Sequence, residues 1–201
     1  MQDILKTNSK INKQTQYTMK SLLFSAGMLM AVFATTAQDV IQDRTARVKF
    51  FSTTPVENID AVNNEATSFI NTKTGDIVFA VLIKSFRFEK ALMEEHFNEN
   101  YMESSKYPKS DFKGKINNLN EVNFQKDGEY AVKVSGNLTM HGVTKPVTAD
   151  GKITVKGGKV FATSKFKVKL DDYKIERPAV VANKIADTIE VTVEADYEPK
   201  K

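Results

Sequence analysis

The chain has 201 residues, of which 41% are apolar and 27% charged, values that suit one soluble globular domain with its own core. Its formal net charge of +4 belongs largely to the first 37 residues, which carry Lys6, Lys10, Lys13 and Lys20 against Asp3 and leave 25 basic and 24 acidic side chains elsewhere. This balance argues against a nucleic-acid partner, which needs a concentrated basic surface. Because the chain has no cysteine, disulfides, thiolate catalysis and Cys-ligated zinc are excluded.

The N-terminal segment has the pattern of a secretory signal peptide. An apolar run, Leu22–Ala34, follows Lys20 and precedes the small residues Thr35–Ala37. A run of this length is shorter than the roughly 20 residues that span a bilayer. We therefore expect cleavage after Ala37, translation from Met19, and an exported, periplasmic or secreted protein formed by residues 38–201. A core helix or a membrane anchor is the alternative interpretation of the apolar run.

Beyond residue 44 the dominant hydrophobic period is two, which is typical of amphipathic strands. In Thr188–Tyr197, apolar side chains alternate with Thr, Glu and Asp, and the same alternation occurs around Tyr130–Val134 and Phe166–Leu170. Short polar and glycine-containing segments separate the runs and predict turns: Thr74-Gly75-Asp76, Asp127-Gly128, Asp150-Gly151 and Gly157-Gly158. Strands at this spacing without intervening helices predict an antiparallel sheet, closed into a barrel or doubled into a sandwich.

One strand and one helix depart from this pattern. Ile77–Ile83 is apolar on both faces, so another element is expected to cover its outer side. The expected cover is the helix at about Glu89–Met102, whose apolar residues recur at helical spacing. Tyr107-Pro108 is expected to end the helical region and begin the next strand.

Two segments carry a resemblance to the YceI-like family. Gly136–Val147, with the sequence GNLTMHGVTKPV, resembles the family's hairpin pattern G-x-L-T-x-x-G-V-T-[KR]-P-V. His96-Phe97, followed by Tyr107-Pro108 and Phe112, resembles the family's helix-to-strand segment. The resemblance covers about residues 44–197. The opening segment Arg44–Phe51 departs from the family's pattern, and the chain has no tryptophan.

The resemblance implies an all-β fold, an eight-stranded antiparallel lipocalin-like barrel with one short helix packed against it. It also implies a long polyisoprenoid or similar lipid in the central tunnel, no catalytic residues, no metal and no cofactor. An interior of eight strands is wide enough for side chains or one small ligand. The expected tunnel lining consists of inward-facing aromatic and branched residues: Phe79, Val81, Phe86, Phe112, Val132, Val134, Leu138, Phe166, Val168, Ile189 and Val191.

The polar candidates have simpler interpretations. His96 is expected at an interface or at the tunnel mouth, and His141 at a surface or turn position, because neither has a metal-ligand partner at suitable spacing. The carboxylates of the helical region are expected to form a solvated face: Glu94, Glu95, Glu99 and Glu103. The lysines Lys165, Lys167 and Lys169 alternate with apolar residues and predict an outer barrel face, with membrane or anionic-headgroup contact as the alternative.

Three functions follow from these expectations. The first is an exported lipid carrier or sequestering protein that makes transient membrane contact. The second is a protein-interaction module whose barrel is filled by its own side chains, and the third is an enzyme on a lipocalin-like scaffold. A continuous tunnel would separate the first from the second. Exposed edge strands would allow a homodimer.

Overall fold

The computed structural model describes residues 39–181 and 183–199. The predicted signal peptide, the start at Met19 and the cleavage point after Ala37 lie outside these ranges and stay predictions. Among the described residues, no helix has both the length and the apolar character needed to cross a membrane.

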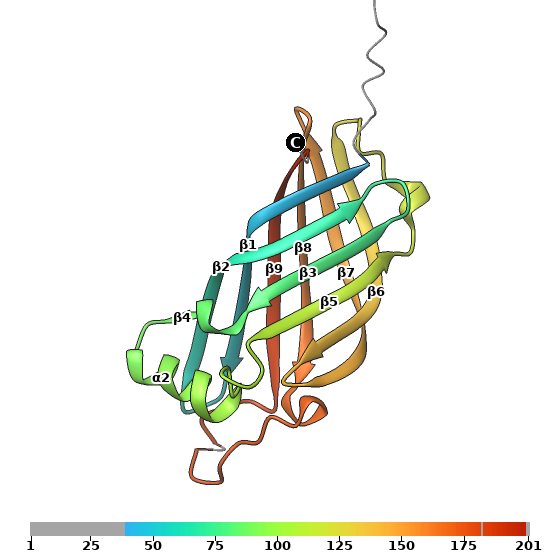
Figure 1. Ribbon diagram of the computed structural model, residues 1–201. Helices are drawn as coiled ribbons and strands as arrows, with labels where there is room; N and C mark the ends of the chain where they lie inside the picture. Colours follow the sequence, from blue (N-terminus) through green and yellow to red (C-terminus); the bar gives the residue numbers. More distant parts are fainter. Residues whose placement is uncertain (1–38, 182, 200–201) are drawn as a thin grey trace, which may run out of the picture. The chain divides into compact units, whose positions relative to one another are not determined.

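The fold is a closed antiparallel barrel of eight strands, as the resemblance implies (Figure 1). The pairing order is β1-β9-β8-β7-β6-β5-β3-β2, and β1 also pairs with β2, which closes the sheet. The eight strands are β1 (Val40–Thr53), β2 (Asn58–Asn71), β3 (Asp76–Leu82), β5 (Lys109–Ile116), β6 (Gly128–Met140), β7 (Val143–Lys156), β8 (Lys159–Lys169) and β9 (Thr188–Pro199). The two-residue strand β4 (Arg87–Phe88) adds to β2. Closure removes the long free edges on which the expectation of a homodimer rested.

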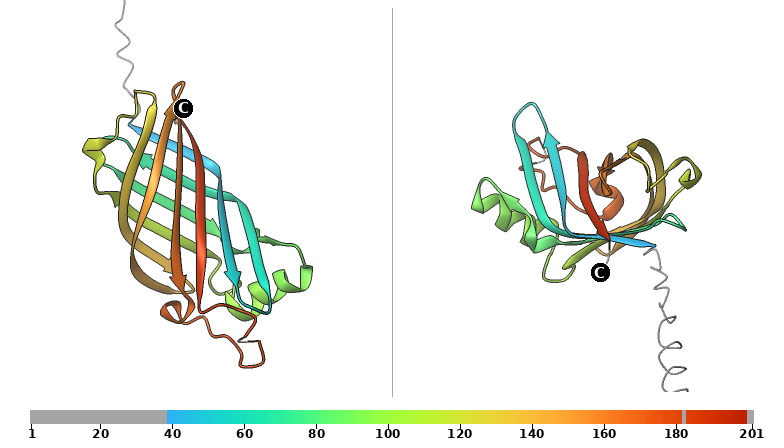
Figure 2. Two further views of the ribbon diagram at one scale, coloured as in Figure 1. Left: turned by 180° about the vertical axis from the view of Figure 1, so that it is seen from behind. Right: turned by 90° about the horizontal axis from the view of Figure 1, so that it is seen from above.

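The short elements lie mainly at one end of the barrel. The α-helix α2 (Ala91–His96) continues into the π-helix η2 (Phe97–Tyr101), and the 3-10 helix η4 (Leu170–Tyr173) begins the loop that leads to β9. Both regions lie at the end of the barrel where β1 meets β2 in a hairpin, as Figure 1 and the rear view in Figure 2 show. Two further 3-10 turns are η1 (Ile83–Ser85) and η3 (Leu119–Glu121).

The predicted role of the helix as a cover for β3 is wrong. Ile77, Phe79 and Val81 point into the barrel, while on the opposite face Leu82 is 44% exposed. The helix packs instead against β4 and the end of the barrel. Val78, Ala80 and Leu82 lie on this outer face, and among the described elements β3 makes its main contacts with its neighbours β2 and β5. Two-faced hydrophobicity was therefore a poor guide to what lies above the strand.

The predicted turns have different outcomes. Gly157 and Gly158 connect β7 to β8 with positive φ angles of 58° and 77°, as a tight hairpin requires. His141 and Gly142 form the same kind of two-residue turn between β6 and β7, with φ angles of 50° and 73°. The predicted turn at Asp150-Gly151 is wrong, because β7 runs through both residues and places Gly151 on the inner face.

A dense core fills the end of the barrel away from the helix. Its inward side chains include Ile41, Val155, Val160 and Tyr197, each at most 7% exposed. Beside them, the buried carboxylate of Asp43 accepts hydrogen bonds from the Thr45 amide and the Asp196 amide, both at 2.8 Å. These hydrogen bonds satisfy the buried carboxylate at the point where the register between β1 and β9 shifts, and the bond from Asp196 links β9 to β1.

Candidate functional site: an apolar cavity

The other part of the barrel interior is hollow. A cavity of about 510 Å³ extends from the middle of the barrel to the end that carries α2, a size within the range of about 300–1,000 Å³ that is usual for ligand sites. Its wall within the barrel is formed almost entirely by inward apolar side chains of the eight strands. Such a wall binds by removing apolar ligand surface from water, with no need for directed polar contacts.

Small inward residues on two adjacent strands create much of this space. Ala149 and Gly151 of β7 lie on the wall beside Ala162 and Ser164 of β8, where larger side chains would fill the interior. A Cβ atom added at Gly151 would lie 3.0 Å from the Thr163 carbonyl oxygen, so the strand pair leaves little room for one. This glycine therefore serves the strand packing and the cavity rather than a turn.

The wall also carries Phe112 of β5, which packs across two glycines. Gly114 of β5 and Gly136 of β6 are paired, and a Cβ on either would lie within 2.6–2.7 Å of the Phe112 ring. A Cβ on Gly136 would also come to 2.4 Å from the Lys113 carbonyl oxygen. Only glycine at both positions lets the strands approach and the ring lie against them, which fixes the position of this aromatic wall.

The helix is held at the mouth by an aromatic cluster. The Phe97 ring contacts Phe50, Phe86 and Phe88, with centroid distances of 5.4, 5.4 and 5.0 Å. These tilted, edge-on and offset arrangements are favourable aromatic geometries. Since Phe50, Phe86, Phe88 and Phe97 all line the cavity as well, the cluster both anchors the helix and forms the wall near the opening.

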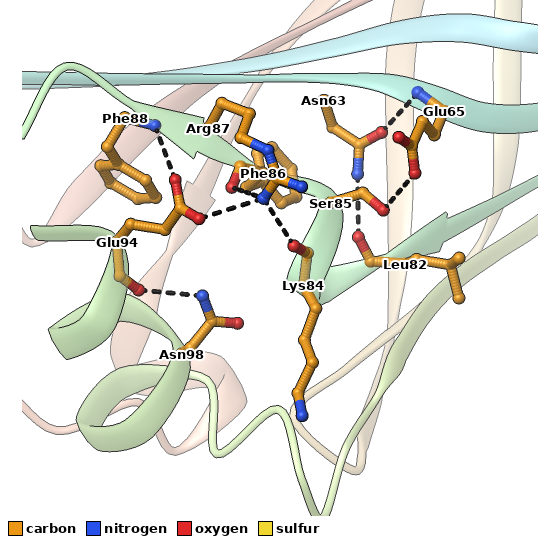
Figure 3. Close-up of polar contacts among 10 residues, drawn as sticks. All are labelled: Asn63, Glu65, Leu82, Lys84, Ser85, Phe86, Arg87, Phe88, Glu94 and Asn98. Atoms are coloured by element: carbon orange, nitrogen blue, oxygen red, sulfur yellow. Dashed lines mark hydrogen bonds and ion pairs between the residues drawn. The ribbon is translucent and has the colours of Figure 1, made fainter. Parts of the chain in front are cut away.

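Polar contacts beside this cluster complete the attachment (Figure 3). The Glu94 carboxylate accepts hydrogen bonds from the Arg87 guanidinium at 3.0 Å and from the Phe88 amide at 3.3 Å. In the neighbouring strands, the Asn63 side chain donates to the Leu82 carbonyl at 2.8 Å, as Figure 3 also shows. The expectation that Glu94 is simply solvated is therefore wrong, because it joins the helix to β4.

His141 connects three segments on the same end of the barrel. Its Nδ1 lies 3.0 Å from the Tyr173 carbonyl oxygen and its Nε2 lies 2.8 Å from the Glu103 carboxylate. The Tyr107 ring packs edge-on against the imidazole at a centroid distance of 4.7 Å. The side chain is only 10% exposed, so His141 occupies a turn, as predicted, but is not a surface residue. Glu103 likewise leaves the predicted solvated face.

The charged residues that line the cavity are few and lie mostly at its mouth. Glu57, Lys90 and Lys184 come from the β1–β2 hairpin, the start of the helix and the loop before β9, and Lys90 pairs with Glu57 at 3.5 Å. His96 lies among them, as predicted. Within the described ranges, no group of three or more His, Cys, Asp or Glu residues is placed to hold a metal ion. The arrangement is an apolar interior with a polar opening, which suits an amphiphile or a purely apolar chain.

The family model for the YceI-like domain matches residues 18–197 of this chain. The chain belongs to the YceI-like family. The sequence resemblance is therefore confirmed, and the match extends over nearly all of the barrel that encloses the cavity. No curated protein matches the sequence.

Solved structures with the same fold include three bacterial proteins. A polyisoprenoid binding domain from Saccharophagus degradans, implicated in plant cell wall breakdown, has a TM-score of 0.70 at 16% identity, over 81% of this chain and 99% of that one. BcnA from Burkholderia cenocepacia has a TM-score of 0.63 at 12% identity, over 76% and 96% of the two chains. The YCEI protein of Campylobacter jejuni has a TM-score of 0.55 at 20% identity, over 70% and 85%. At these identities the likeness establishes the fold.

This YceI-like barrel places every predicted lining residue on the cavity wall. The strand residues share the inward face, and Phe86 reaches the wall from the segment between η1 and β4. Their contact with a lipid stays a prediction.

The contributions of β1, the helix and the loop before β9 to the cavity wall were not predicted from the sequence. Val48 and Phe50 line the cavity from β1, and their alternation within Arg44–Phe51 could have identified them. Met93 and Ile185 approach from the helix and the loop. Nothing in their local pattern indicated that these two segments meet at one end of a barrel.

Proposed function

We propose that this protein is an exported, non-catalytic binding protein that holds a long-chain isoprenoid or similar apolar lipid in its barrel, as a carrier or a sequestering agent. The observation that carries the proposal is the apolar cavity, open at one end and continuous with the barrel interior. It argues against a barrel filled by its own side chains. The polyisoprenoid binding named for the Saccharophagus degradans domain supports the same class of ligand here.

The non-catalytic assignment rests on the chemistry of the wall. Deep in the cavity the inward residues are chiefly Phe, Val, Ile, Leu and Ala, and the ionisable side chains gather near the mouth. General acid–base or nucleophilic catalysis needs paired polar groups in contact with the reacting atoms. The export assignment rests on the signal-like segment Leu22–Ala34.

Transient membrane contact is supported by exposed apolar residues around the mouth. Leu92 of the helix is 60% exposed and lines the cavity, and Val56 lies beside Glu57 at 57% exposure. Val180 is 89% exposed and lies beside Val181, another wall residue. Three exposed apolar side chains from three segments border one opening, where a lipid would pass between the cavity and a bilayer.

The direct test is native mass spectrometry of residues 38–201, followed by organic extraction of any bound species. We expect a bound lipid, or uptake of an added polyprenyl lipid. Ala149→Phe should abolish loading by filling the cavity, whereas Ala131→Phe, on the exposed face of the adjacent strand β6, should not. Protein that stays empty after incubation with polyprenyl lipids, or equal loading of the two variants, would contradict the proposal.

A further inference from the structure

We propose that Tyr197 and its neighbours at the floor of the cavity set the length of the apolar chain that the barrel accepts, an inference that rests on the proposed lipid-binding function. The cavity includes Ile153 of β7 and Ala162 of β8 in its wall. It does not include the next inward residues toward the closed end, Val155, Val160 and Tyr197. The floor therefore lies between two successive rows of side chains.

The strand registers define these rows. Ile153 pairs with Ala162, and Ala162 pairs with Ala195, so these residues form one row across β7, β8 and β9. Val155 pairs with Val160, which pairs with Tyr197, and this second row lies two residues farther along each strand. The side chains of Val155, Val160 and Tyr197 are at most 5% exposed. They form a packed plug directly below the hollow part of the barrel.

Tyr197 is the largest member of the plug and is held in place by a polar contact. Its hydroxyl lies 2.5 Å from the Ser68 hydroxyl on β2, and Ser68 donates in turn to the Val78 carbonyl at 3.1 Å. Because the Val78 carbonyl can only accept, this arrangement has Tyr197 donating to Ser68. Tyr197 is 1% exposed and Ser68 is fully buried. A hydrogen-bonded phenol spanning from β9 to β2 fixes the plug more firmly than an aliphatic side chain, which has no directional contact.

The plug has further support on the side away from the cavity. Leu119, Val122 and Phe124, in and after η3, pack against the same core cluster. A chain that enters from the mouth therefore stops at the second row and cannot continue through the barrel.

A ligand whose polar end stays at the mouth would therefore be selected by the depth of the floor. Each additional methylene buried in an apolar site strengthens binding about fourfold, whereas a methylene left in water contributes nothing. Removing the Tyr197 ring would deepen the cavity by more than two carbons, and partial collapse of the surroundings would reduce that gain. We expect Tyr197→Ala to shift the preference toward a longer chain by about tenfold.

The experiment loads the refolded, lipid-free protein from an equimolar mixture of farnesol, geranylgeraniol and solanesol, and measures the bound ratio by native mass spectrometry. Tyr197→Ala should raise the share of the longer alcohols. Ala162→Leu, which adds volume at the floor, should raise the share of farnesol. Tyr197→Phe keeps the ring but loses the hydroxyl, so it should leave the ratio of the wild type unchanged.

The outcomes separate the two proposals. Wild-type protein that binds the alcohols, with the same ratio in Tyr197→Ala and Ala162→Leu, would overturn the floor's role and leave lipid binding intact. Wild-type protein that binds none of them would overturn the proposed function and this inference together. Should Tyr197→Ala fail to fold, Ala162→Leu decides alone, because it adds packing rather than removing it.

Discussion

The attachment of the helix at the mouth provides a sharp test of the structure through Phe97→Ala. Phe97 makes three aromatic contacts, with Phe50, Phe86 and Phe88. Each such contact contributes about 0.5–1.5 kcal/mol beyond burial, and the half-buried ring contributes about 1 kcal/mol more. Since part of each contact energy is recovered by relaxation, we expect the free energy of unfolding of the helical segment to fall by about 2.5 kcal/mol.

This loss should appear locally. The helical segment spans only residues 91–101, too short to be stable without tertiary contacts. Hydrogen exchange followed by mass spectrometry should show protection in this segment falling by roughly 50- to 100-fold, because about 1.4 kcal/mol corresponds to a factor of ten. The barrel strands should keep their protection.

The matched control is Leu92→Ala, in the first turn of the same helix at 60% exposure, which should change protection less than threefold or so. Unchanged exchange in residues 91–101 of Phe97→Ala would refute the view that the ring cluster holds the helix. An equal loss in the barrel strands would refute the view that the helix is a separate local unit. If lipid binding holds as proposed, Phe97→Ala should also release its ligand faster, since the helix forms part of the mouth.

Three more predictions follow from particular side chains. Burial, with a smaller contribution from Asp43, raises the pKa of Tyr197 above its ordinary value of 10.0. The stability that comes from burying the neutral phenol is complete below about pH 10 and is lost as the pH rises above it, by about 1.4 kcal/mol per pH unit. In urea unfolding between about pH 10 and pH 11, the free energy of unfolding should therefore decline more steeply for the wild type than for Tyr197→Phe. Parallel declines would contradict this reasoning. Gly142→Ala should lower the free energy of unfolding in urea by about 2–4 kcal/mol, because φ is 73° and the new Cβ would lie 2.5 Å from the Tyr107 ring. Gly158→Ala, at φ 77° but with open space around the new Cβ, should lower it by only about 1 kcal/mol. Similar losses in the two variants would show that the ring contact is unimportant. Val180→Asp should reduce co-flotation with phosphatidylcholine vesicles at least about threefold, whereas Phe161→Asp, on the outer barrel wall, should not; equal effects would contradict contact through the mouth.

Strand alternation predicted the barrel wall well because it is a local property. In a strand, successive side chains point to opposite faces, so Phe166 and Val168 could be assigned to one face without knowing their neighbours. The same logic placed Tyr197 on the dry face of the last strand. Closure into a barrel came from the resemblance, since alternation alone also fits a sandwich.

The features that could not be predicted depend on contacts between distant segments. Tyr197 meets Ser68 across 129 positions of sequence, and His141 meets Glu103 and Tyr173 across 38 and 32. No local pattern distinguishes a serine that fixes a plug from one in a loop. Gly151 was misassigned for a related reason: an Asp-Gly pair favours turns, but here the packing of adjacent strands decided the conformation.

Stability and binding are separated along the axis of this barrel. At the closed end, Val155, Val160 and Tyr197 pack densely, and none of the three lines the cavity. In the hollow part, Ala149 and Ala162 leave volume unfilled, and empty apolar volume costs about 24 cal/mol per Å³. A lipid that fills the hollow part would recover contact energy there, while the closed end keeps the strands in register whether or not the ligand is present. The dense end can thus stabilise the fold while a lipid enters and leaves the hollow end, as the proposed function of a reversible carrier requires.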